Sequence, residues 1–239
     1  MTIQAVCEYN DGGFLIYAVN FPGAFVRGKT ENEALAKFGG ELRSYLRWSG
    51  ISKPDPENPT VEVVQRKHSS LAICDADSDV LFDAEKKSLT QEEYAQLKLL
   101  VLKSARDFRR LYESIPNPDI SGRAPRQTFY GPVPNTPKEM YEHTNRVTSY
   151  YTAAFGLETE NLADIYSNRL QALSELEDLP DFLSGKVYTA DDREEWTLRK
   201  VLRRFLWHDR IHAKAMWRTA HALWGSDIVN PFCFIGSEI

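Results

Sequence analysis

The sequence lacks the features of membrane-spanning and secreted proteins. Its longest apolar runs, such as LKLLVL at residues 97–102, are far shorter than the roughly 20 apolar residues that cross a bilayer. The first residues, MTIQAVCEYND, do not combine a basic stretch with an apolar core, so we expect no signal peptide. Only three cysteines occur, Cys7, Cys74 and Cys233, and none has C-x-x-C spacing. These absences predict a cytoplasmic protein with reduced thiols and no membrane association.

The chain also lacks an excess of basic residues. It has 29 Lys and Arg against 34 Asp and Glu, a formal net charge of -5, which argues against nucleic acid as its main partner. No phosphate-binding loop, Ser-His-Asp order or cysteine nucleophile can be found. What is present is ordinary: 239 residues, 42% hydrophobic and 26% charged, as in a globular protein with one large domain or two small ones.

Residues 1–66 have the pattern of a small α+β domain. The alternating runs IQAVCEY and GFLIYAV are joined by Asn10-Asp11-Gly12-Gly13, which predicts a β-hairpin. The run AFVRG then leads to Thr30-x-x-Glu33, a capping box that predicts a helix ending at Gly50. The stretch TVEVVQ predicts a final strand, so the expected order is βββαβ.

The stretch NDGGFLIYAVNFPGAFVRGKTENEALAKFGGELRSYL resembles the HicB-like antitoxin fold. The resemblance covers roughly residues 3–66 and depends on the glycine hairpin, the Pro-Gly turn and G-x-T-x-x-E-A-L at the start of the helix. It implies that this half binds a protein partner, as HicB-like antitoxins bind small toxins. The family's usual DNA-binding segment is not visible in the sequence. A small α+β module without an antitoxin role is the alternative.

Residues 67–89 are predicted to connect this domain to the rest of the chain. Asp75, Asp77 and Asp79 imitate the start of a calcium loop, but Val80 replaces the required Gly and Lys86 replaces the closing Glu. We therefore expect a short hairpin instead, with LAIC and VLF on either side of an acidic turn.

From Thr90 onward the hydrophobic period becomes 3.6 residues, which predicts a four-helix bundle over residues 90–239. The expected helices begin at the capping box Thr90-x-x-Glu93, run from Thr136 to Gly156, cover NLADIYSNRLQALSELED, and extend from Asp191-Asp192 to Gly225. The loop 116–135 is long for a compact domain, and such loops are often functional. We expect the two halves to have separate cores, so that a fragment beginning near Ser88 folds alone.

Three of the five histidines are predicted to face the core of this bundle. At about 100° per residue, His208 and His212 lie on the inward side of the last helix, and two imidazoles one turn apart can converge on one ion. His143 lies on the apolar stripe of the second helix. The alternative is that the three are hydrogen-bonded core residues, each of which would need a partner. The projection directs the following residues to a solvated face: Arg203, Arg210, Lys214, Arg218 and His221.

The histidine in EMYEHTNRV, the tryptophan in EEWTLRKVLRRFLWHDRIH and the closing H-x-x-x-H are similar to motifs of the DinB-like superfamily of metal-binding four-helix bundles. The match spans roughly residues 90–226. By this resemblance His143, His208 and His212 are the three ligands of one metal ion. The superfamily includes enzymes that use a divalent metal to activate a low-molecular-weight thiol or a water.

Four further side chains are candidates for roles beside the metal. Glu139 and Asp209 can orient ligands, with a helix-capping carboxylate and a buried salt-bridge partner as their alternatives. Arg146 and Tyr150 lie beside His143 and can bind an anionic substrate, with surface and core roles as alternatives.

Two classes of function remain. Three imidazoles leave a coordination position open, as catalytic sites do, which favours a thiol S-transferase or hydrolase with a small-molecule substrate and an open site beneath residues 116–135. Zinc or nickel is expected first, with iron, copper and manganese as alternatives. The second class is a binding protein whose HicB-like half holds a protein partner and whose metal is structural. The sequence also leaves a homodimer open.

Overall fold

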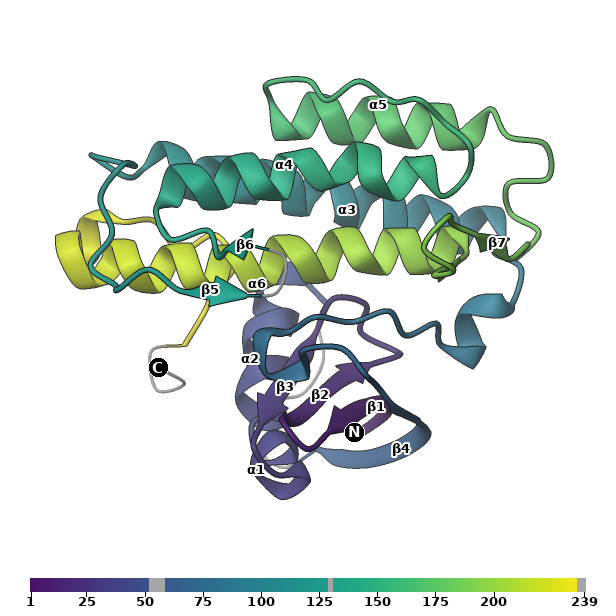
Figure 1. Cartoon of the computed structure of the whole chain (residues 1–239), viewed down its shortest axis with the longest axis horizontal. Coiled ribbons are helices and arrows are strands. Elements are labelled where there is room, and N and C mark those ends of the chain that lie inside the picture. Colours follow the sequence, from purple (N-terminus) through teal and green to yellow (C-terminus); the bar gives the residue numbers. More distant parts are fainter. Residues whose placement is uncertain (52–58, 129–130, 236–239) are drawn as a thin grey trace.

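The computed structural model describes residues 1–51, 59–128 and 131–235, and contains a mixed four-stranded sheet followed by a helical part (Figure 1). This confirms the predicted order of an α+β part followed by a mainly helical part; the second part is not purely helical, because it also contains four short strands. The strands are β1 (Thr2–Asn10), β2 (Gly13–Ala18), β3 (Phe25–Gly28) and β4 (Thr60–His68). Their order in the sheet is β3-β2-β1-β4, in which β4 pairs parallel with β1 and the other pairs are antiparallel.

The predicted hairpin joins β1 to β2 at the expected residues, with Asn10 opposite Gly13. The Asn10 side chain accepts a hydrogen bond from the Gly12 amide at 2.9 Å, which closes the turn. Gly13 has φ of 145°, and a Cβ there would lie 3.0 Å from the carbonyl oxygen of Gly28 on the neighbouring strand. Only glycine therefore suits this position.

The single helix expected over residues 31–49 is instead two helices, α1 (Glu31–Leu35) and α2 (Phe38–Ser49). Thr30 caps α1 by accepting from the Glu33 amide, and Gly50 ends α2 in the left-handed region, both as predicted. The interruption coincides with a tightened turn, because the Lys37 amide bonds to the carbonyl three residues back rather than four. The Lys37 ammonium also donates to the Arg27 carbonyl at 2.7 Å, which attaches the interruption to β3.

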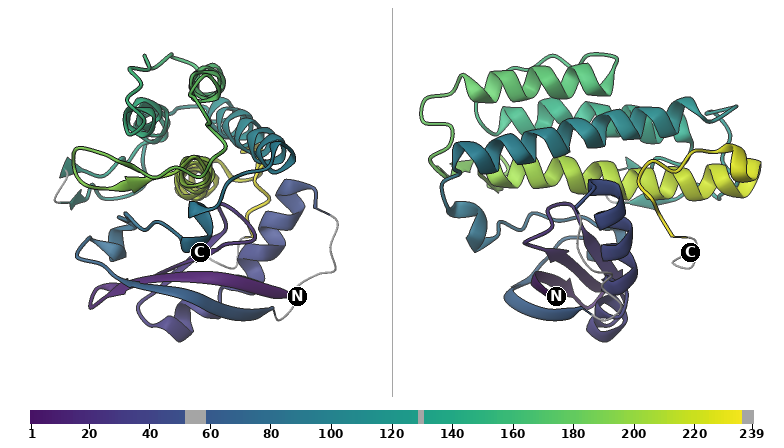
Figure 2. Two further views of the ribbon diagram at one scale, coloured as in Figure 1. Left: turned by 90° about the vertical axis from the view of Figure 1, so that its right-hand side faces the viewer. Right: turned by 180° about the vertical axis from the view of Figure 1, so that it is seen from behind.

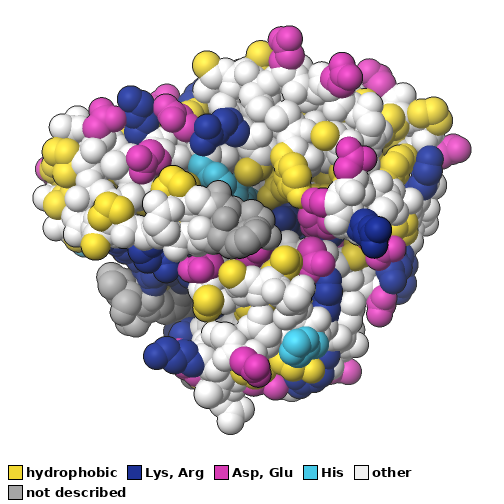
Figure 3. All heavy atoms as spheres, viewed as in Figure 1, with side chains coloured by type: hydrophobic (Ala, Val, Ile, Leu, Met, Phe, Trp, Pro, Cys, Tyr) yellow, Lys and Arg dark blue, Asp and Glu magenta, His cyan; other side chains and the backbone are white. Residues whose placement is uncertain are grey.

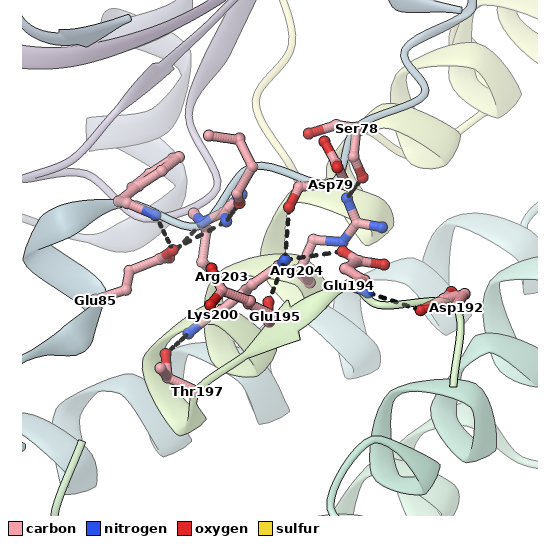
Figure 4. Close-up of polar contacts among 12 residues, drawn as sticks. Ser78, Asp79, Glu85, Asp192, Glu194, Glu195, Thr197, Lys200, Arg203 and Arg204 are labelled. Atoms are coloured by element: carbon pink, nitrogen blue, oxygen red, sulfur yellow. Dashed lines mark hydrogen bonds and ion pairs between the residues drawn. The ribbon is translucent and has the colours of Figure 1, made fainter. Parts of the chain in front are cut away.

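The hairpin predicted within residues 67–89 is wrong. This segment, which is described throughout, contains the 3₁₀ turns η1 (Ile73–Asp75) and η2 (Asp83–Lys86) and no strand beyond the end of β4. Side chains of the last helix occupy the backbone carbonyls that a hairpin would pair: Lys200 donates to Asp79, Arg203 to Val80 and Arg204 to Ser78 (Figure 4). Charged donors from a distant helix thus replace the strand ladder.

The helical half contains the four expected helices, α3 (Gln91–Glu113), α4 (Pro137–Ala153), α5 (Ile165–Glu177) and α6 (Leu198–Trp224). Figure 2 shows them nearly end-on in its left view. The capping boxes predicted at Thr90 and Thr136 are both present. Between the helices lie two short hairpins, β5 (Gln127–Thr128) with β6 (Gly131–Pro132) and β7 (Tyr188–Thr189) with β8 (Glu195–Trp196).

The predicted start of the last helix at Asp191-Asp192 is wrong, because α6 begins at Leu198 with Thr197 as its cap. Asp192 uses its carboxylate to close a turn, accepting from the Glu194 amide at 2.9 Å, and Arg193 there has a positive φ of 71°. The acidic pair therefore marks the β7–β8 turn rather than a helix N-terminus.

Helix α6 lies between the other three helices and the N-terminal half, as both views of Figure 2 show. The prediction that its basic face is solvated is wrong for Arg203 and Arg210, which are 3% and 1% exposed. Arg203 bonds to Glu85, and Arg210 donates to Glu41 at 2.7 Å. His221 is exposed, as predicted.

The expectation of two separate cores is also wrong. One cluster of buried apolar side chains extends from Ile3 in β1 to Phe234 near the end of the described chain and includes residues of all four long helices. A smaller cluster packs Tyr17, Phe25 and Phe82 against Trp207 of α6. The boundaries placed at residues 66 and 90 stay predictions. Within the described residues, no helix is long and apolar enough to cross a membrane.

Candidate metal centre

The three histidines singled out from the sequence meet in the structure. His143 comes from α4, and His208 and His212 come from successive turns of α6. Their ring centroids are 5.0 Å (143–208), 4.8 Å (143–212) and 4.5 Å (208–212) apart. Figure 3 shows histidine atoms at two places on this face, one on the helical part and one on the sheet part.

The ring nitrogens lie close enough together to be candidate ligands of one ion. One ligating atom from each histidine can be chosen so that all three lie within 4.8 Å of one another, and the Nε2 atoms of His143 and His208 are 3.2 Å apart. A tetrahedral ion about 2.1 Å from each nitrogen would hold its ligands about 3.4 Å apart, which the pair of His143 and His208 matches, and a separation near 4.8 Å would have to shorten when an ion binds. Among the described residues, no other group of three or more His, Cys, Asp or Glu side chains meets this geometry.

Burial favours the neutral form of the three imidazoles. Burial lowers the pKa of His143 and takes that of His208 well below its usual range. Burial, followed by the charges of His143 and Arg27, lowers the pKa of His212 to about 3. A neutral imidazole has a free lone pair at neutral pH, which is the form that binds a metal.

The three histidines therefore have the chemistry that a metal site requires. His208 is buried, and its Nδ1 atom has no hydrogen-bond partner within the described residues. The alternative of three satisfied core histidines requires a partner for each buried ring, and among the described residues His208 has a ring-nitrogen contact to His143 and none at Nδ1. Three converging neutral nitrogens suit zinc, nickel, copper or iron. The coarse prediction of a metal-binding histidine group thus agrees with the structure, while the identity of the ion stays a prediction.

Asp209 lies next to His208 in sequence but makes a different contact. It is fully buried and accepts from Arg169 of α5 at 2.9 Å. Burial raises the pKa of Asp209 to about 6, against the opposing charge of Arg169. The structure thus gives Asp209 the contact of the salt-bridge alternative.

Glu139 also makes the contacts of its alternative role. Its carboxylate accepts from the backbone amides of Asn135 and Thr136, at 2.8 and 3.0 Å, and so completes the cap of α4. These bonds hold the pKa of Glu139 below its usual range. The carboxylate stabilises the start of the helix that carries His143.

The two pocket candidates differ in their distance from the histidines. Arg146 is exposed on α4 one turn after His143, and its charge lowers the pKa of that histidine. Tyr150 lies seven residues after His143, about 10 Å along the helix axis. Its hydroxyl donates to Asp192 and Glu194, at 2.9 and 3.3 Å, in the β7–β8 hairpin. The structure therefore keeps Arg146 close to the histidine group and does not bring Tyr150 to it.

A cavity of about 950 Å³ reaches the group at His212. Its walls come from β3, α2 and α6 and from the loop before α4, including Arg123, Arg126 and Pro134. An opening beneath residues 116–135 was expected from the sequence, and the cavity lies there. Its wall on the sheet side, which includes Arg27 and Arg43, was not expected, because no local pattern links those residues to histidines 100 or more positions later.

Comparison of the chain with models of protein families, with curated proteins and with solved structures finds no match to any of them.

Proposed function

We propose that the protein is a metal-dependent enzyme of the DinB-like kind, a thiol S-transferase or hydrolase, with one divalent ion on His143, His208 and His212. Zinc or nickel is the first expectation for that ion. The observation that carries the proposal is the cavity at His212, because a purely structural metal site is normally closed by four protein ligands. Here three nitrogens converge and one of the three rings borders open space.

A divalent ion in this position would supply the chemistry of an activated nucleophile, by lowering the pKa of a bound water to about 7 or by deprotonating a bound thiol. The chain itself supplies orientation. His208 and His212 are fixed one turn apart on a helix that is packed on both sides, and the capping box at Thr136 and Glu139 stabilises the start of the helix that carries His143. Such fixed nitrogens leave little reorganisation for metal binding.

The second candidate is a binding protein in which the HicB-like half holds a protein partner and the metal only stabilises the bundle. The observation that favours it is β4, an edge strand with alternating exposed side chains, including Val64 at 49% exposure. An exposed edge can pair with a strand of a partner or of a second copy of the chain.

Thiol binding to cobalt-loaded protein tests the proposal. Addition of a low-molecular-weight thiol to the loaded full-length protein should produce a thiolate-to-cobalt charge-transfer band, because the ion has an exchangeable position facing the cavity. His212→Ala should abolish the band, and His221→Ala, on the exposed part of the same helix, should retain it. A loaded protein without any band, and without turnover of a chromogenic ester or alkylating electrophile, would support the scaffold function instead.

A further inference from the structure

The cavity beside His212 concentrates positive charge. Seven lysines and arginines line it, against two carboxylates, those of Glu41 and Asp75. The whole chain has 29 cations and 34 acids, so 22 cations and 32 acids lie elsewhere. Although the protein is acidic as a whole, the residues around this cavity carry a strong excess of positive charge. The low-dielectric walls of the cavity strengthen the field of these charges.

The two carboxylates of the lining are already engaged. Glu41 accepts from Arg210 at 2.7 Å and lies 3.7 Å from Lys214, while Asp75 lies 3.3 Å from Arg126. In the described part of the chain, the ion pairs include no carboxylate partner for Arg43 or Arg123. Protein carboxylates therefore neutralise only part of the positive charge in the lining.

Two other arginines of the lining, Arg126 and Arg218, act on Arg27. The guanidinium of Arg27 makes one long hydrogen bond, 3.4 Å to the Cys74 carbonyl. Desolvation at the cavity wall lowers its pKa, and the charges of Arg126 and Arg218 lower it further. Like charges held together in this way are stabilised by an anion placed between them. Arg27 and His212 both line the cavity, so an anion held by the arginine shares one hollow with the histidine.

The cationic wall is assembled from parts of the chain that are distant in sequence. Arg27 belongs to β3, Arg43 to α2, and Arg123 and Arg126 to the loop before α4. The cavity thus exists only where the N-terminal half meets the bundle. Guanidinium groups bind carboxylates and phosphates through paired hydrogen bonds, and about 950 Å³ is within the range of small-molecule sites.

We infer that the N-terminal half completes a substrate pocket, and that this cavity binds a small molecule with two or more negative charges, carboxylates or phosphates, with its reacting end at His212. The inference rests on the proposed function for the role of substrate. The binding of the anion itself does not depend on the metal.

Calorimetric titration of the metal-free, full-length protein tests the anion site, with pyrophosphate as the phosphate probe and tricarballylate as the carboxylate probe. At least one should bind, and the stronger of the two identifies the preferred group. The double substitution Arg27→Gln/Arg123→Gln should weaken binding about tenfold or more, because two charge-assisted contacts are removed. Arg43→Gln alone should also weaken the binding of the anion. Arg106→Gln, an exposed arginine of α3 outside the cavity, should bind as the wild type does.

Cobalt-loaded protein tests the link to the histidines. The same anion should change the visible absorption of the bound cobalt in the wild type, and the change should need a higher anion concentration in the double variant. Absence of binding by both probes, or equal binding by the wild type and the double variant, would overturn the anion site while leaving the metal site standing. Anion binding that leaves the cobalt spectrum unchanged would overturn its role as the substrate pocket. Anion binding to a protein that takes up no metal would defeat the proposed function alone.

Discussion

Arg210 of α6 and Glu41 of α2 form an ion pair across 2.7 Å in the buried junction of the two halves, with side-chain exposures of 1% and 2%. The residues are 169 positions apart in sequence. The aromatic rings of Tyr45 and Trp48 lie about 5 Å from the guanidinium carbon, which adds cation–π contacts to the pair. The junction is thus held by charge as well as by apolar packing.

Removing one partner of this pair should be costly. Glu41→Ala leaves the Arg210 charge buried without its partner, and we expect a loss of about 3–5 kcal/mol in the free energy of unfolding, measured by urea denaturation. Glu113→Ala, which breaks the exposed pair of Glu113 with Arg109, is the matched control and should cost far less. Equal losses for the two variants would show that the junction pair is solvated.

Metal content should depend on three histidines and on no others. Substitution of His143, His208 or His212 by alanine should weaken zinc binding by at least about 100-fold, since loss of a supporting hydrogen bond alone costs about 10–100-fold. His221→Ala and His68→Ala should each retain about one ion per chain in elemental analysis. A wild-type protein purified without chelators that holds no divalent metal, even after incubation with zinc, would contradict the site.

The turn at Pro22-Gly23 should tolerate no side chain. Gly23 has φ of 94°, and a Cβ there would lie 2.7 Å from the Cβ of Leu206 on α6. Gly23→Ala should therefore combine a backbone penalty of about 1–2 kcal/mol with a steric penalty of about 1–3 kcal/mol. Gly50→Ala is the control, because Gly50 has φ of 72° but open space around it, and only the backbone penalty applies. Thermal unfolding of the two variants separates the contributions.

A fragment beginning at Ser88 should not behave as an independent bundle. Without the N-terminal half, α6 exposes Trp207 and the buried guanidinium groups of Arg203 and Arg210 to water. We expect the fragment to bind hydrophobic dyes and to unfold at a lower denaturant concentration than the full chain. A soluble fragment with the full helical signal, the same denaturation midpoint and no dye binding would show that the junction contributes little.

Stability should depend on the charge state of Glu8. Glu8 of β1 is fully buried and bonded to Ser78, and burial raises the pKa of its carboxyl to about 6 from 4.5. Between these two values the folded state holds the proton more tightly than the unfolded state, so the contribution of Glu8 to stability falls as the pH rises from about 4.5 to about 6. The loss amounts to about 2 kcal/mol at most, at 1.36 kcal/mol per pKa unit.

Glu8→Gln keeps the shape and removes the titration. The difference in unfolding free energy between the variant and the wild type should therefore grow in favour of the variant over this pH interval and stay constant above about pH 7. A difference that does not change with pH would mean that Glu8 titrates normally in the folded protein.

Sequence patterns predicted the parts of this structure that are determined locally. The Asn10–Gly13 hairpin and the caps at Thr90 and Thr136 each depend on residues within a few positions of one another, and all three are present. The histidine group was predictable for a related reason, since i, i+4 spacing fixes His208 and His212 on one face whatever the rest of the chain does. The position of His143 was less certain from the sequence, because it depends on how α4 packs against α6.

The environment of α6 could not be predicted in this way. A helical projection separates apolar from charged positions, and Arg203 and Arg210 were assigned to solvent on that basis. Their carboxylate partners, Glu85 and Glu41, lie more than 100 residues earlier in the sequence. The sequence patterns around these two carboxylates do not indicate that they pack against α6. The cationic cavity could not be predicted for the same reason. Its arginines come close together only when the two halves pack against each other.

The central position of α6 has a consequence for synthesis of the chain. A ribosome makes the sheet, the connector and three helices before it makes the helix against which they all pack. Until Trp207 has emerged, the apolar surface formed by Tyr17, Phe25 and Phe82 lacks its cover, and the carbonyls of the connector lack their donors. The nascent protein therefore presents an unfinished, aggregation-prone surface until α6 has been made, and its final compaction follows the synthesis of that helix.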